Sequence, residues 1–112
     1  MDDNIKAKIV EALSGSQIGA IVACALGVDL GWGHARFTSK AIITSDGYVQ
    51  ANFLSGANVA HHSAFVGSYD DLAENLRSVG EFLRLKVGIG EEDRRELNKA
   101  VLTDWIATDY RS

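Results

Sequence analysis

The chain has 112 residues, of which 46% are hydrophobic and 23% charged, with a net charge of −4 and a pI near 5.2. This composition predicts one folded domain over residues 1–112 and excludes a disordered chain. The acidic balance argues against nucleic-acid binding, which usually needs a basic stripe. The apolar run at residues 18–28 is far shorter than the about 20 residues of a membrane span. A single cysteine suits a reducing compartment, so we expect a cytoplasmic protein.

Two helices are predicted at the N-terminal end. Residues 2–14 carry apolar side chains at the spacing of one helix face. Ser16 can cap a second helix, apolar nearly all round and therefore buried, which runs to about Leu26 and ends at Gly27. Cys24 lies there among apolar neighbours, so we interpret it as a small buried hydrophobic residue, not a reactive thiol.

A β-hairpin is predicted around Gly47, between two segments rich in β-branched and aromatic residues. A two-residue loop would mix polar and apolar residues on both faces of the hairpin. A three-residue loop over residues 45–47, with Gly47 at positive φ, instead makes one face mostly apolar. This register pairs Ile43 with Val49, Ala41 with Ala51, and Ser39 with Phe53.

A third strand is predicted after a turn at residues 55–58. It covers residues 59–66, completes an antiparallel meander and ends at Gly67. Ser68 and Asp71 then have the spacing of a capping box, which opens a helix. The inward positions of that helix follow a period of 3.6 residues: Leu72, Leu76, Val79 and Leu83, widened by Phe82.

A last helix is predicted after the acidic residues 91–93, which favour the positive end of a helix. Its inward positions are Leu97, Val101 and Trp105, with Leu102 and Ile106 beside them. The predicted fold is therefore α+β, in the order α-α-β-β-β-α-α, with a three-stranded antiparallel meander packed against helices. We expect one face of the sheet to lie on the apolar stripes of the last two helices.

Charge is distributed unevenly along the chain. Only four of the 26 charged residues lie within residues 12–69, and residues 47–69 contain none. Sheets without charged residues lack the side chains that normally prevent pairing with another copy. We therefore expect an oligomer interface on the outward face of the sheet, formed by Tyr48, Gln50, Asn52 and Leu54.

A second hypothesis is a ligand or partner pocket at the junction between helices and sheet. Trp32, His34 and Arg36 place an aromatic ring, a base and a guanidinium close together, and His61 and His62 lie in the predicted third strand. Tryptophan also commonly fills the edge of a core, which is the simpler interpretation of Trp32.

The sequence predicts neither a metal site nor a cofactor. His61 and His62 are adjacent in a strand and point to opposite faces, and the spacing of zinc ligands is absent. The glycines of residues 27–33 follow a helix and precede a strand, as in a turn, whereas a phosphate loop follows a strand. No catalytic residue is indicated by spacing.

Two functions remain open. The first is a small cytoplasmic interaction protein that acts as a homo-oligomer, most simply a homodimer, and leaves its acidic helices for a protein with a basic surface. Chains of this kind are often encoded by phages or other mobile elements, which would make a host protein the partner. The alternative is a small-ligand-binding protein or simple enzyme that uses the Trp32 pocket. A pH profile near the histidine pKa of about 6.5, or stabilisation by a ligand, would favour the alternative.

Overall fold

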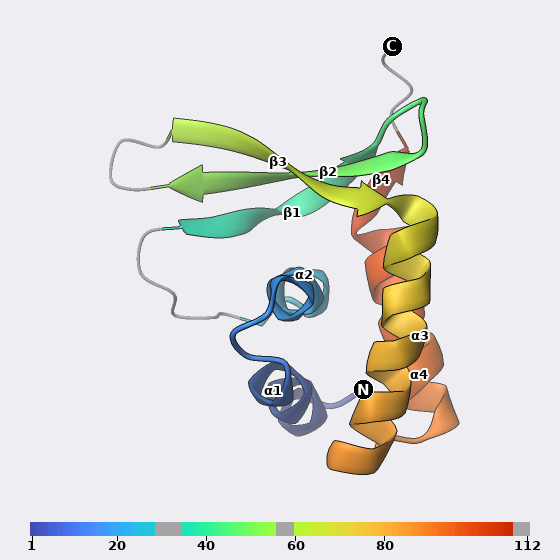
Figure 1. Cartoon of the computed structure of the whole chain (residues 1–112). Helices are drawn as coiled ribbons and strands as arrows, with labels where there is room; N and C mark the ends of the chain where they lie inside the picture. The colour runs from blue at the N-terminus through green and yellow to red at the C-terminus, as the bar shows by residue number, and fades with distance from the viewer. Residues whose placement is uncertain (29–34, 56–59, 109–112) are drawn as a thin grey trace.

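The computed structural model describes residues 1–28, 35–55 and 60–108, with the backbone alone for 35–40, 52–55, 60–65 and 107–108. Two helices precede a three-stranded antiparallel meander, and two helical segments follow it. All of these helices lie on one side of the sheet (Figure 1). The structure therefore has the α+β class and the order of elements that the sequence predicts.

The two N-terminal helices begin at side-chain caps, of which the sequence predicted the one at Ser16. α1 (Asp3–Ala12) follows Asp2, whose carboxylate accepts a hydrogen bond of 2.8 Å from the amide of Ile5. α2 (Gln17–Leu26) follows Ser16, whose hydroxyl accepts a bond of 3.0 Å from the amide of Gly19. The middle of α2 is buried, in agreement with its apolar sequence.

The sheet has the strand order β3-β2-β1-β4. Its meander consists of β1 (Ala35–Ile43), β2 (Tyr48–Ser55) and β3 (Ala60–Ser68). The sequence analysis did not predict β4 (Ile106–Thr108), which runs parallel to β1. It assigned Ile106 to the last helix, because a three-residue strand is too short to show an alternating pattern.

The hairpin between β1 and β2 has the predicted three-residue loop. Ile43 pairs with Val49, and the amide of Gly47 donates to the carbonyl of Thr44 over 3.0 Å. Gly47 has a φ of +84°, as the predicted loop requires. The predicted pairing of Ser39 with Phe53 is wrong, because Phe53 pairs with Phe37. A bulge between residues 37 and 41 of β1 shifts the register, and no feature of the alternation marks it.

The positive φ of Gly47 gives a prediction for the hairpin. Gly47→Val should lower the free energy of unfolding by at least about 1 kcal/mol more than Asp46→Ala, because a β-branched residue is strained in the left-handed region. Asp46 is exposed, so its truncation removes little packing. Denaturation midpoints would measure both changes. Equal loss in the two variants would show that the loop does not require this conformation in solution.

β3 continues two residues beyond the predicted span of 59–66, to Ser68. Val49 pairs with Gly67, whereas Gln50 pairs with Phe65, so Val66 is an extra residue in β3. Gly67 therefore belongs to a bulge, with a φ of +133°, and does not terminate the strand. The predicted start at Val59 lies outside the described residues.

The capping box of the third helix is confirmed at its N-cap. α3 (Tyr69–Lys86) follows Ser68, whose hydroxyl accepts a bond of 3.0 Å from the amide of Asp71. Leu76 and the other leucines of the predicted stripe are buried. Phe82 was assigned to this stripe wrongly: it is 44% exposed, because its position lies at the border of the buried stripe of α3.

The last helical segment has two parts. α4 (Glu91–Lys99) continues into the π-helix η1 (Ala100–Asp104), whose wider turn precedes Trp105. The predicted inward positions Leu97, Val101 and Trp105 are all buried. The π-helix ends the helical run, so that Ile106 enters β4 instead of another helical turn.

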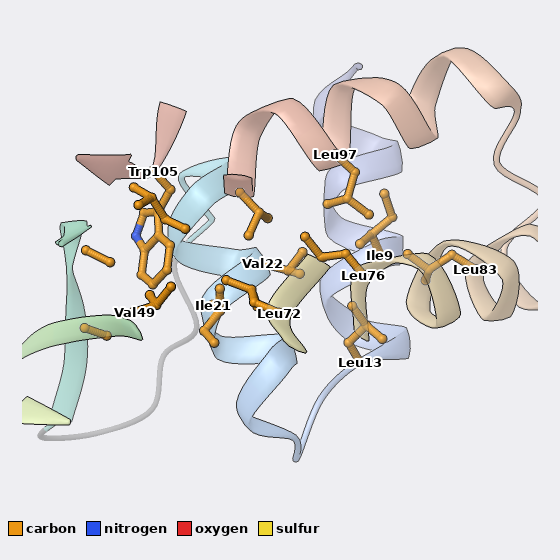
Figure 2. Close-up of a cluster of buried hydrophobic side chains, with 14 of the residues drawn as sticks. Ile9, Leu13, Ile21, Val22, Val49, Leu72, Leu76, Leu83, Leu97 and Trp105 are labelled. Carbon is orange, nitrogen blue, oxygen red and sulfur yellow. The ribbon is translucent and has the colours of Figure 1, made fainter. Parts of the chain in front are cut away.

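The core is one cluster of buried side chains that extends from the sheet to α1 (Figure 2). Trp105 and Leu72 lie with Ile21 of α2 and Val49 of the sheet, whereas Leu76 lies farther away, among residues of α1 and α4. The prediction that the sheet rests on the stripes of the last two helices is therefore only partly correct. Helix α2 contacts β1, and most of the α3 and α4 stripes enclose α1.

Candidate interaction surface

The two faces of the sheet differ in what covers them. Ala41, Val49 and Ala51 are 0% exposed and belong to the core beneath the helices. Strand alternation directs their neighbours Ile42 and Gln50 to the opposite face. Ile43 packs against the core, whereas Ile42 does not belong to that cluster. In Figure 1 none of the helices lies over this opposite face.

We call this opposite side the outer face; its described side chains are Ile42, Thr44, Tyr48 and Gln50. Tyr48 is 48% exposed, one of three large hydrophobic side chains with such exposure among those described. The amide of Tyr48 donates to the hydroxyl of Thr44 over 3.3 Å, and Thr44 donates its own amide to the Tyr48 carbonyl over 2.8 Å. The outer face thus combines an exposed aromatic ring with uncharged polar groups, a composition typical of protein interfaces.

The register extends this surface across the whole sheet. One row of paired positions runs from Ala107 in β4 through Ile42 and Gln50 to Phe65 in β3. No position of this row carries a charged residue. This row lacks the charged side chains that commonly keep sheets apart in solution, whereas the row of Leu54, farther along the sheet, includes Arg36.

The predicted interface residues fall on β2. Tyr48 and Gln50 lie on the outer face as predicted. Asn52 and Leu54 continue the same alternation along β2, where they pair with Ser63 and His61. Their side chains lie outside the described part of the structure, so their place in an interface stays a prediction.

The predicted ligand pocket is described only at its strand positions. Trp32 and His34 lie outside the described residues. Arg36 pairs with Leu54, and Leu54 pairs with His61, so these three positions form one row. His62 pairs with Phe53 in the adjacent row. The two histidines therefore occupy separate rows, and the described residues contain no group of side chains that could hold a metal ion.

A shallow depression of about 360 Å³ lies among α1, α2 and the last helical segment, away from the sheet. Its acidic groups face cations: the amine of Met1 donates to Glu96 over 2.6 Å, and Lys99 lies 3.8 Å from Asp104. The hydrogen bond to Glu96 raises the pKa of the Met1 amine above its usual value. These contacts form a polar surface and no converging set of catalytic groups.

The charged residues of α3 and α4 form exposed ion pairs. Glu81 accepts hydrogen bonds of 3.1 and 2.6 Å from the guanidinium of Arg84, and Arg94 lies 3.6 Å away. The bond from Arg84 lowers the pKa of Glu81, and the same contact raises the pKa of Arg84. Exposed pairs of this kind add little to stability, and we interpret them as part of the solvated helical surface.

A second apolar surface lies on α3 and was missed by the sequence analysis. Phe82 and Leu85 are 44% and 72% exposed, three residues apart on the helix. Leu85 falls outside the buried stripe of α3. An apolar residue off the apolar stripe of a helix was the signal in the sequence that could have indicated this surface. This pair is smaller than the outer face and lies beside the Glu81–Arg84 ion pair.

Comparison with protein-family models, curated proteins and solved structures gives no match to this chain. Within the described part of the chain, no helix has the length and apolar character needed to cross a membrane. The surface on the sheet therefore has to be interpreted from its own chemistry.

Proposed function

We propose that the protein is a small cytoplasmic interaction protein that acts as a homo-oligomer, most simply a homodimer, through the outer face of its sheet. The observation that supports this proposal is a sheet face without a covering helix, whose described side chains are uncharged and include the exposed ring of Tyr48. Burial of such a face against an identical face removes apolar area from water without leaving a charge unpaired.

The helices supply the surface that remains in water. The 22 charged residues outside residues 12–69 carry the entire net charge of −4, because the four inside are two acids and two bases. In α4 the exposed acids Glu91, Glu92 and Glu96 predominate. This helical surface suits contact with a second protein whose surface is basic. One hypothesis is that a phage or other mobile element encodes this chain and that the second protein belongs to the host.

The alternative function as a small-ligand-binding protein has one observation in its support, the row formed by Arg36, Leu54 and His61. A row of backbone positions does not by itself form a pocket. Ligand-induced thermal stabilisation that depends on His61 would favour this alternative over the interaction protein.

Sedimentation velocity at micromolar concentration tests the proposal. We expect a species of about twice 12.1 kDa. Gln50→Lys should shift it toward monomer, because the new charge would be desolvated in the interface without a partner. Ser78→Lys adds the same charge at an exposed position of α3 and should leave the dimer intact. A wild-type protein that stays monomeric throughout this range would contradict the proposal.

A further inference from the structure

The arrangement of charges points to a specific geometry for the homo-oligomer. We infer that two copies pack outer face against outer face, which gives four layers with the sheets inside and the helices outside. The inference rests on the proposed self-association and identifies its symmetry and central residue. It follows from three observations: the separation of charges between layers, the features of the sheet edges, and the size of the outer face.

The charges favour this order of layers. The helical layer holds most of the charged residues and the whole net negative charge, whereas the stretch that forms the meander is nearly uncharged. Contact between two helical layers would bring like charges together, which is unfavourable. Contact between two outer faces keeps the helical layers apart and hydrated. Electrostatics therefore favours sheets inside over helices inside.

The edges of the sheet are less suited to self-pairing than its face. At one edge, β1 carries Lys40 and a bulge, and β4 covers residues 41–43. Arg36 pairs with Leu54, so its position belongs to the far end of the outer face. At the other edge, β3 has a bulge at Val66, immediately before α3. Bulges and basic residues are features that limit the pairing of edge strands. The outer face has no such feature among its described side chains.

The outer face is also the larger of the two exposed apolar surfaces in the described part of the structure. Three strands of eight or nine residues, at spacings of about 4.8 Å between strands and 3.4 Å between residues, cover a flat area of roughly 400 Å². Protruding side chains make the accessible area larger than this flat area. A stable interface of standard size buries about 800 Å² per partner. The exposed Phe82 and Leu85 offer only two side chains for comparison.

Gln50 is the described side chain nearest the centre of this interface. It lies on β2, between β1 and β3, in the row that crosses the whole sheet. A two-fold axis near this position would bring Gln50 close to Gln50 of the second copy. A carboxamide both donates and accepts hydrogen bonds, so two glutamines can pair reciprocally across the axis. Tyr48, two residues away, would contribute its exposed ring on each side.

Cysteine cross-linking tests this geometry in the full chain. The native Cys24 is first replaced in a Cys24→Ala background, so that each variant has one thiol. Gln50→Cys and Thr44→Cys report on the outer face, His62→Cys on the β3 edge in a row of the opposite face, and Ser78→Cys on the exposed side of α3. Each folded variant is treated with a short bis-maleimide, after sedimentation has shown its oligomeric state. We expect rapid cross-linking to the dimer for Gln50→Cys, slower cross-linking for Thr44→Cys, and none above background for the other two.

The possible outcomes separate the inference from the proposed function. A dimer that cross-links through His62→Cys would indicate edge pairing of β3, and one that cross-links through Ser78→Cys would indicate contact between helices. Either result would overturn the face-to-face geometry and the assignment of the interface to the outer face, and would leave self-association itself in place, as would a dimer that cross-links at none of the four positions. A wild-type monomer would remove the proposed function together with the inference.

Discussion

Replacement of Gly19 by alanine is expected to lower the free energy of unfolding by about 3 kcal/mol, which is high for overpacking at one position. A Cβ atom at Gly19 would lie 2.1 Å from the carbonyl oxygen of Leu13 and 2.9 Å from its carbonyl carbon. Both are backbone atoms in the connection between α1 and α2, so they cannot rotate away.

The surroundings of Gly19 leave little space for relaxation. The hydroxyl of Ser16 donates to the Leu13 carbonyl over 2.7 Å and accepts from the Gly19 amide over 3.0 Å. An added methyl group would have to separate α1 from α2 and disturb both bonds. The loss would appear as a lower denaturation midpoint and as faster amide exchange in α1.

Gly80→Ala is the matched control for this prediction. Gly80 is also buried in a helix, but a Cβ atom there would lie 2.7 Å from Nε of Arg94, which belongs to a flexible side chain. That side chain can move aside, and alanine has a helix propensity about 1 kcal/mol better than glycine. We expect a change within about 1 kcal/mol. Similar destabilisation by both variants would show that the contact with the Leu13 carbonyl is not the cause.

Leu76→Ala is expected to cost 2–5 kcal/mol of stability, roughly the range for buried leucines. Leu76 is 1% exposed, and Figure 2 shows it among Ile9, Leu83 and Leu97, where α1, α3 and α4 meet. Truncation would leave a cavity that three helices enclose, and the backbone of three helices collapses only partly onto such a space. Chemical denaturation of the variant and the wild type measures the loss.

Leu85→Ala provides the same truncation at an exposed position of the same helix. Leu85 is 72% exposed, so we expect a change within about 0.5 kcal/mol. A small effect at Leu76 would mean that α3 does not pack on α1 in solution. A large effect at Leu85 would instead show that its apolar surface is buried, as in an oligomer that uses α3.

Part of the candidate surface could be predicted from the sequence. Alternation in the hairpin assigns Tyr48 and Gln50 to one face and Val49 to the other, because side chains in a strand alternate with a period of two. The absence of charge from residues 47–69 marked the same strands. The row from Ala107 to Phe65 could not be predicted, because it depends on β4 and on the bulge at Val66.

The sequence by itself determined the local elements of this protein, since their signals act over a few residues. The Ser16 and Ser68 caps, the Gly47 loop and the buried stripe of α3 each depend on side chains within one or two turns. The α+β order follows from these elements.

Only the tertiary structure decided how the elements pack. It placed α2 against the sheet, enclosed α1 with the stripes of α3 and α4, and left Phe82 in solvent. Periodicity shows that a helix has an apolar face but does not identify the element that the face contacts, because hydrophobic burial is non-directional. The packing of the four helices on one side of the sheet also determined which face of the sheet stays uncovered.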